Sequence, residues 1–359
     1  MEMIRGQVTG QTTGGNAGKN GTRIITVSGE SRLVHMHGDM IVNKALMEKQ
    51  QIMASRRRTK RWAYRDSYYP ETIWQDGVPY EFDSSLSNIS VASLTNAMRF
   101  WQENTCVTFR ERSNETQYIL YTSENSGCFS TVGKDNSQPI QPVNIGRGCQ
   151  HFGITTHEIA HALGLFHHQQ RYDRDNYITF NEENVQFRYW LNFAKIPSKY
   201  LDTYELPYDI GSVMHYTPTE FSDNQYLYAL TAKNPDYEGA MGSMDMPSFL
   251  DVQIINRHYQ CHDACNATEN KPRCLNGGYV DPRNCTLCNS DSMWRPHTDD
   301  FIVDQDENSA HFSWATTKAP PNRRVMIGLK SVKGNCQEGC YTTAVEMKMG
   351  GDFRPVGYR

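Results

Sequence analysis

Three histidines lie within eleven consecutive residues of this chain, at spacings that suit a metal ion. The stretch reads His-Glu-Ile-Ala-His-Ala-Leu-Gly-Leu-Phe-His, from His157 to His167. Positions i and i+4 of a helix return to nearly the same face, so His157 and His161 can aim ring nitrogens at one ion. Gly164 permits a left-handed residue that ends the helix, after which His167 can supply a third nitrogen. Three protein ligands leave one tetrahedral position open, which is typical of catalytic zinc.

Glu158 follows the first of these histidines and is the predicted catalytic residue. Its carboxylate can reach a water molecule at the metal without being a ligand, as a general base must. It can then pass the proton to the departing amine, so that one residue acts first as base and then as acid. Histidines on an amphipathic helix are also common as plain structural residues. The glycine and the third histidine in register favour zinc-dependent hydrolysis instead.

The composition restricts the compartment and the partners. With 36 Lys and Arg against 40 Asp and Glu, the chain offers no field for nucleic acid or an anionic membrane. No apolar run is long enough to span a bilayer. Ten cysteines indicate disulfides and therefore an oxidising compartment. Although no secretory signal is visible at the amino terminus, we expect a secreted protein. A cytosolic protein with free thiols is the alternative.

The predicted elements are those of an α+β fold. Strands are predicted at residues 74–82, 107–109 and 118–121, and helices at residues 41–53, 91–104 and 154–165. Residues 1 to about 30 are too polar for a core and are expected to be disordered. The chain after His167 is rich in loops. The zinc helix would therefore form the floor of a cleft between two lobes, and the cleft would hold an extended substrate strand.

Several motifs resemble landmarks of the astacin family of metzincin zinc endopeptidases. They are the zinc motif, Trp101–Phe109, Gly127-Cys128, Gly148-Cys149, Arg171–Asp175, Ser212–Tyr216 and Ile255–Cys261. The resemblance covers residues 62–261 and implies a two-lobed peptidase domain with one zinc ion, the zinc helix lying in the cleft. It also implies two disulfides, Cys106–Cys261 and Cys128–Cys149.

Ser212–Tyr216 resembles the Met-turn of that family. Met214 would form an apolar floor under the three imidazoles, although a buried methionine is more commonly an ordinary core residue. Tyr216 would place a phenol near the metal, where it can donate a hydrogen bond to the oxygen on which negative charge develops. His215 is not expected to be a ligand, because the resemblance assigns the third histidine to His167. The family commonly carries a glutamate at the next position, where this chain has His168.

The amino-terminal part resembles an inhibitory prosegment. Residues 36–39, Met-His-Gly-Asp, are similar to the family signature in which an aspartate binds the zinc, which makes Asp39 the zymogen switch. Gly-Asp is also an ordinary turn pair. Residues 56–61 carry five positive charges, and a proprotein-processing protease is expected to cleave after Arg61. A plain charged linker is the alternative.

The carboxy-terminal part resembles two small modules. The expected domains are a prosegment at 1–61, a peptidase domain at 62–262, a degenerate EGF-like module at 263–291 and a partial CUB-like β-rich region at 292–359. The pairing of six cysteines is left open: Cys265, Cys274, Cys285, Cys288, Cys336 and Cys340. Zinc binding by Cys285 and Cys288 with the last two cysteines is a second possibility.

The sequence thus predicts a secreted zinc endopeptidase that is made as a zymogen and acts on extracellular proteins. The alternative is an inactive astacin-like binding or matrix protein. Such a scaffold would have no physical need for Glu158.

Overall fold

The computed structural model of the protein describes a large part of the chain. The described residues are 24–27, 31–36, 39–43, 63–65, 67–224, 226–242, 244–269, 271–274, 277–289 and 355. The predicted cleavage site Arg61 lies outside them, as does the CUB-like region apart from Pro355. No helix in these ranges is long and apolar enough to cross a membrane.

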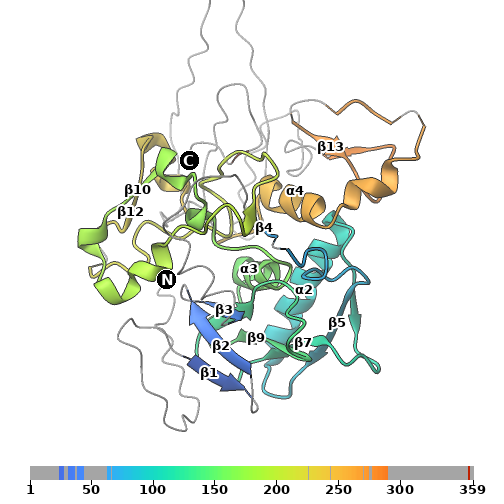
Figure 1. The fold of residues 1–359 in the computed structure, drawn as a ribbon, viewed down its shortest axis with the longest axis horizontal. Helices are drawn as coiled ribbons and strands as arrows, with labels where there is room; N and C mark the ends of the chain where they lie inside the picture. The colour runs from blue at the N-terminus through green and yellow to red at the C-terminus, as the bar shows by residue number, and fades with distance from the viewer. Residues whose placement is uncertain are drawn as a thin grey trace, which may run out of the picture.

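The first lobe is built on an eight-stranded mixed sheet (Figure 1). Its strand order is β1-β2-β3-β8-β9-β7-β5-β6. The strands are β1 Ile24–Val27, β2 Ser31–Met36, β3 Met40–Asn43, β5 Val78–Phe82, β6 Phe109–Glu111, β7 Tyr118–Thr122, β8 Cys128–Thr131 and β9 Ile140–Ile145. Strands β6, β5, β7 and β9 run parallel, whereas β8 is antiparallel to β9. The amino-terminal strand β3 extends the sheet by pairing parallel to β8.

Two helices pack together beside this sheet, and the second of them carries the first two histidines of the zinc motif (Figure 1). Helix α2 spans Asn88–Asn104, and the Ser87 side chain caps its first turn by accepting a hydrogen bond from the Ser90 amide. Helix α3 spans Phe152–Ala162. All but its first residue are buried. The predicted helices at 91–104 and 154–165 are therefore confirmed, with boundaries that differ by at most three residues.

Two tryptophans of the first lobe bind the backbone of α3. The buried Trp101 indole donates a hydrogen bond to the Thr156 carbonyl at 3.2 Å. The Trp74 indole donates to the Ala162 carbonyl at 3.1 Å. Because Ala162 ends the helix, its carbonyl has no partner farther along α3. The two bonds therefore fix both halves of the zinc helix against the same core.

The second lobe contains few regular elements. They are β4 Ala63–Tyr64 with β11 Leu201–Asp202, β10 Ile178–Phe180 with β12 Leu230–Ala232, the short 3-10 helices η1 His168–Gln170, η2 Arg174–Asn176, η3 Glu182–Asn184, η4 Phe187–Phe193 and η5 Pro235–Ala240, and helix α4 Phe249–His258. A small core of aromatic and aliphatic side chains lies between them, including Phe193, Tyr208 and Tyr216. The expectation of a loop-rich second half is confirmed.

Four disulfides join the described residues. Cys106–Cys261 and Cys128–Cys149 confirm the pairing that the family resemblance implies. Cys265 pairs with Cys285, and Cys274 pairs with Cys288. Because Cys285 and Cys288 are oxidised, the alternative of a second zinc site on these two thiols is wrong.

The hairpin that these last two disulfides close packs directly on helix α4 and on the end of α2. Its strands are β13 Tyr279–Val280 and β14 Cys288–Asn289, and it follows the 3-10 helix η6 Cys261–Cys265. The Tyr279 ring stacks on Phe249 of α4, with centroids 5.4 Å apart. The Arg283 guanidinium donates a hydrogen bond to the Thr105 carbonyl after α2. These contacts connect the hairpin to both α2 and α4.

Two expectations for the amino-terminal part are wrong where the structure describes it. Residues 41–43 belong to strand β3, not to a helix. Residues 24–27 form strand β1, although the segment up to about residue 30 is expected to be disordered. In both places, non-local pairing overrides local composition: β3 pairs with β8, and β1 pairs with β2. Residues 44–53 lie outside the described part.

Candidate metal centre

The end of α3 separates the first two histidines from the third. Leu163 and Gly164 follow the helix, and the φ angle of Gly164 is +107°, in the region that favours glycine. The Gly164 amide donates to the His161 carbonyl at 2.8 Å, which reverses the chain. A Cβ at position 164 would lie 2.9 Å from Nε2 of His258. The predicted role of this glycine as the turn before His167 is confirmed.

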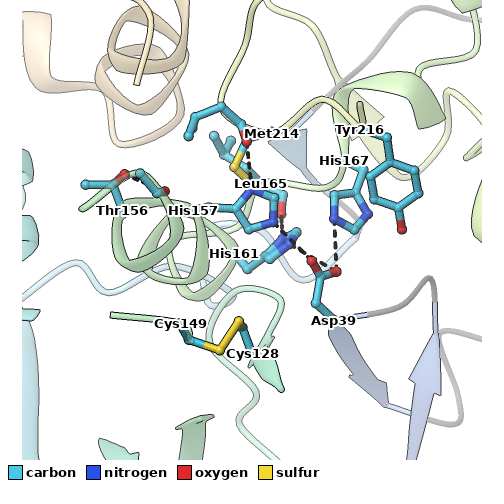
Figure 2. A network of polar contacts seen from close by, with 12 residues as sticks. Asp39, Cys128, Cys149, Thr156, His157, His161, Leu165, His167, Met214 and Tyr216 are labelled. Carbon is cyan, nitrogen blue, oxygen red and sulfur yellow. Dashed lines mark hydrogen bonds and ion pairs between the residues drawn. A yellow bond between two sulfur atoms is a disulfide. The ribbon is translucent and has the colours of Figure 1, made fainter. Parts of the chain in front are cut away.

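The three histidines converge on the carboxylate of Asp39 (Figure 2). The distances from Asp39 oxygens are 2.9 Å to Nε2 of His167, 3.3 Å to Nε2 of His157 and 3.7 Å to Nε2 of His161. All four side chains offer a ligand atom within 4.8 Å of one another. Residues that are 118 positions apart in sequence, such as Asp39 and His157, thus form one cluster.

The donor set of this cluster fits zinc. Nδ1 of His157 lies 2.7 Å from the Val213 carbonyl, and Nδ1 of His161 lies 2.7 Å from the Leu165 carbonyl. A carbonyl can only accept, so each Nδ1 donates its proton and each Nε2 keeps a lone pair. Lone pairs that face a carboxylate repel it unless a metal ion or a proton lies between them. Three imidazole nitrogens and one carboxylate oxygen are ligands that zinc binds in tetrahedral sites.

The Asp39 carboxylate is ionised in this environment. Burial raises the pKa of Asp39, but the interactions with His167, His157 and His161 outweigh it and hold the pKa well below its usual range. The backbone of Asp39 is fixed as well, because its carbonyl accepts a hydrogen bond from the Ser130 amide of β8 at 2.9 Å. The next residue, Met40, is fully buried. Strand β3 therefore delivers a charged carboxylate to the histidines.

Glu158 is buried beside the cluster, with only 1% of its surface exposed. Burial, followed by the negative charge of Asp39, raises the pKa of Glu158 well above its usual range. Its Oε2 atom has no hydrogen-bond partner among the described residues. A carboxyl group with a free oxygen, next to the ligands but outside the ligand set, has the geometry of a proton carrier.

The segment Ser212–Tyr216 lies against the histidines, and Met214 is fully buried there. The Val213 carbonyl, next to Met214, accepts a hydrogen bond from Nδ1 of His157 at 2.7 Å. The Met214 carbonyl accepts a hydrogen bond from the His168 amide at 2.7 Å, which joins the turn to the segment after His167. The structure thus places Met214 in a buried turn that is bonded to the segment after His167, and its role under the imidazoles stays a prediction.

Asp251 of helix α4 fixes this turn, and sequence reasoning missed it. Its carboxylate accepts hydrogen bonds from the Ser212 hydroxyl at 2.5 Å and from the Val213 amide at 2.9 Å. The same carboxylate closes a capping box with Ser248 at the start of α4. The Ser-x-x-Asp pattern at 248–251 was the available sequence signal for this helix start.

Tyr216 lies against the third histidine, with ring centroids 4.5 Å apart (Figure 2). Its surface is 3% exposed, and burial followed by the charge of Asp39 raises the pKa of its phenol well above the usual range. The phenol is therefore a protonated donor near the cluster. The structure brings Tyr216 to the site that the sequence predicts for it.

Two further histidines lie outside the ligand set. Nε2 of His215 lies 2.8 Å from the Tyr208 hydroxyl, and its Nδ1 donates to the Tyr216 carbonyl. His215 is therefore no ligand of this cluster, as expected. Nε2 of the fully buried His168 accepts a hydrogen bond from the Asp209 amide at 2.9 Å. Burial holds the pKa of His168 well below its usual range, so the ring is neutral.

The chain is similar to known zinc peptidases. The sequence model of the Astacin peptidase family matches residues 66–260. Zinc metalloproteinase nas-29 of Caenorhabditis elegans is 39% identical over 94% of this chain, and zinc metalloproteinase nas-23 of the same nematode is 43% identical over 84%. The chain spans 69% of the first relative's length and 60% of the second's.

One solved structure with a similar sequence comes from a fish. High choriolytic enzyme 1, a hatching enzyme zinc-protease from the medaka Oryzias latipes, matches with 32% identity and a TM-score of 0.49. The match covers 55% of this chain and 98% of that chain.

Proposed function

The chain belongs to the astacin family of zinc metalloendopeptidases, and from that premise we propose that it is a secreted zymogen. Asp39 blocks the zinc site in the latent form. Cleavage after Arg61 by a proprotein-processing protease releases it, and the mature enzyme hydrolyses peptide bonds of extracellular proteins.

One observation carries this proposal: the Asp39 carboxylate contacts all three imidazoles at distances of 2.9 to 3.7 Å. His157, His161 and His167 are the zinc ligands in this account. The carboxylate of Asp39 occupies the position that a catalytic zinc site otherwise leaves open. The prosegment therefore holds the enzyme inactive until the backbone pairing between β3 and β8 is lost.

When bound, zinc supplies a Lewis acid that polarises the peptide carbonyl and favours deprotonation of water. Glu158 takes the proton from the attacking water on its free Oε2 atom and delivers it to the leaving amine nitrogen. Tyr216 donates a hydrogen bond to the carbonyl oxygen as negative charge develops there. Burial of both side chains excludes bulk water from these proton positions.

Secretion is supported by the four disulfides among the described residues, because such bonds persist in oxidising compartments. The position of β4 supports cleavage after Arg61. Ala63 forms an isolated bridge with Leu165, and the Tyr64 amide donates to the Gly164 carbonyl at 2.9 Å. A chain that begins at residue 62 would keep these contacts, so the turn between the histidines would not be disturbed.

The latency of the full chain is tested with Asp39→Ala. The uncleaved parent is expected to cleave a denatured protein poorly, and trypsin treatment should activate it by more than about tenfold. The uncleaved Asp39→Ala chain should already be active, because no carboxylate competes for the metal. Asp76→Ala, which changes an exposed aspartate of the first lobe, is the matched control and should stay latent. Equal activity of the uncleaved parent and the Asp39 variant would contradict the zymogen.

The catalytic role of Glu158 is tested in the processed chain. Glu158→Gln keeps the size of the side chain and removes its basicity. It should lower kcat by about a hundredfold or more and leave one zinc per chain. A processed parent that holds zinc and cleaves nothing would instead favour an inactive binding protein. Amino-terminal sequencing of the secreted form checks the cleavage after Arg61.

A further inference from the structure

Phe221 has a backbone conformation that is unfavourable for a bulky side chain. Its φ angle is +58°, one of four positive values among the non-glycine residues that the structure describes. A residue with a Cβ pays free energy to adopt this left-handed region, and it persists only where the surroundings enforce it. Such residues cluster at functional sites. Phe221 follows Tyr216 by five residues, which makes the strain relevant to the metal centre.

Hydrogen bonds on both sides force this conformation. Before Phe221, the Glu220 amide donates to the Thr217 carbonyl at 3.3 Å, so the chain turns immediately after Tyr216. After it, Ser222 forms an isolated bridge with Val185. The Asp223 amide donates to the Asn184 carbonyl at 2.9 Å. The turn and this attachment fold residue 221 back over the second lobe.

The result is an aromatic contact with Tyr216. The centroids of the Phe221 and Tyr216 rings are 5.5 Å apart, and the planes are tilted by 45°. The Phe193 ring meets Tyr216 edge-on at 5.7 Å and Phe221 at 6.2 Å. Tyr189 contacts the Phe221 ring at 5.3 Å. Tyr216 therefore touches His167 and, through two further rings, the core of the second lobe.

We propose that Phe221 is a positioning residue whose ring, with Phe193, holds the phenol of Tyr216 where it can bind the developing oxyanion. The proposal rests on the function proposed for Tyr216. The rings that surround a buried phenol set its position, and a displacement of about 1 Å can cost up to a hundredfold in rate. The positive φ angle of Phe221 is the strain that allows its ring to contact Tyr216, five residues earlier in the same loop.

The experiment uses the processed full chain loaded with zinc. Phe221→Leu removes the ring and keeps an apolar side chain with the same backbone strain. It should lower kcat by about tenfold and change KM by less than about twofold. Phe221→Tyr keeps the ring and should restore kcat to within about twofold of the parent. Phe187→Leu changes a phenylalanine of the same lobe that is 72% exposed, and it should have no effect.

A double-mutant cycle separates positioning from general destabilisation. In a Tyr216→Phe background there is no phenol to position, so Phe221→Leu should cause no further loss of kcat. Losses that multiply would overturn the proposal and leave the role of Tyr216 intact. If Tyr216→Phe alone leaves kcat unchanged while Glu158→Gln abolishes turnover, the proposed role of Tyr216 fails, and this inference fails with it.

A second measurement does not depend on turnover. A phosphinic pseudopeptide carries a tetrahedral oxyanion and mimics the transition state, so its affinity reports the Tyr216 hydrogen bond. Calorimetry should show about tenfold weaker binding to Phe221→Leu and unchanged zinc content. Unchanged binding would contradict the proposal. If Phe221→Leu does not fold, Phe221→Met replaces it, and loss of folding in both variants would make Phe221 a purely structural residue.

Discussion

The two lobes position their parts of the metal centre by different physical means. In the first lobe, His157 and His161 lie on a regular helix whose backbone bonds to two buried indoles, those of Trp74 and Trp101. In the second lobe, His167 lies between a turn and a single turn of 3-10 helix. There, side chains provide hydrogen bonds that a regular helix or sheet would supply through its own backbone.

Asp251 and Gln169 show this use of side chains. The Asp251 carboxylate binds the Ser212 hydroxyl and the Val213 amide, and the Gln169 side chain accepts from the Tyr216 amide at 3.2 Å. In a sheet or helix, backbone hydrogen bonds of the same kind repeat along the element. Here each backbone amide depends on one side-chain acceptor. A helix that loses one contact keeps the rest, whereas an irregular turn that loses its single partner does not. We therefore expect substitutions in the second lobe to disturb the metal centre more.

The largest effect is expected from Asp251→Ala. The substitution leaves the buried amides of Val213 and Ser248 without an acceptor and removes the capping box of α4. The free energy of unfolding should fall by about 3–5 kcal/mol, as for a broken buried polar network. Zinc affinity should fall as well, because the turn under the imidazoles loses its support. Urea unfolding and a competitive zinc titration measure the two quantities.

The control for this variant lies in the first lobe. Asp83→Ala removes a carboxylate that accepts from the Ser85 amide near the surface. Its zinc affinity should equal that of the parent. A zinc affinity that falls equally in both variants would show that the turn near Met214 has no special dependence on Asp251.

Trp101→Phe tests the other side of the comparison. Loss of the indole N–H and of its volume in the core should lower the free energy of unfolding by about 2 kcal/mol. The hydrogen bonds within α3 still fix the spacing of His157 and His161, so kcat of the processed enzyme should stay within about threefold. A loss of zinc affinity as large as that of Asp251→Ala would refute the distinction between the lobes.

A pH titration tests the junction of the lobes at His258. This buried ring lies beside the Gly164 turn and within 3.0 Å of the Tyr204 hydroxyl, and burial followed by the charge of Arg65 lowers its pKa from 6.5 to about 3. In the unfolded chain the His258 ring binds a proton below its ordinary pKa of 6.5, whereas in the folded chain it stays neutral down to about pH 3. The contribution of His258 to stability is therefore constant above pH 6.5 and falls as the pH decreases from 6.5 towards 3.

His258 should account for about 1.4 kcal/mol of stability lost between about pH 8 and about pH 5.5. His258→Gln has no titratable side chain at this position. Over the same pH interval, its free energy of unfolding should therefore fall by about 1.4 kcal/mol less than that of the parent. Urea unfolding at several pH values measures both curves. Parallel curves would show that His258 takes up a proton in the folded enzyme.

The regular half of the site was predictable from sequence, because its information is local. The spacing of His157 and His161 and the glycine at 164 determine a helix and its end within a few residues. Asp251 lies 39 positions after Ser212, and no local pattern indicates that the cap of one helix also binds a distant turn. Strand β3 was missed for the same reason, because its pairing partner Ser130 is 90 positions away from Met40.

The family resemblance predicted several non-local features that composition and periodicity could not. The disulfides Cys106–Cys261 and Cys128–Cys149 and the position of Asp39 at the histidines are examples. The pairing of Cys265 with Cys285 and of Cys274 with Cys288 remained open, since the six carboxy-terminal cysteines allow fifteen arrangements. The packing of that hairpin on α4 had no signal in the sequence at all.

The smallest expected effect concerns that hairpin. The Tyr279 hydroxyl accepts a hydrogen bond from the Asn256 amide at 3.2 Å, and the same amide donates to the Asn104 carbonyl at the end of α2. Tyr279→Phe keeps the ring stacked on Phe249 and removes the hydroxyl's bonds to Asn256 and Asn289, so it should cost about 1 kcal/mol. If the hairpin is part of the peptidase core, the protein unfolds in a single thermal transition, and this cost lowers the Tm of that transition.

Tyr226→Phe, at a position that is 81% exposed, should leave Tm unchanged. A separate transition for the hairpin, with an unaltered main Tm in Tyr279→Phe, would mean that it folds independently of both lobes.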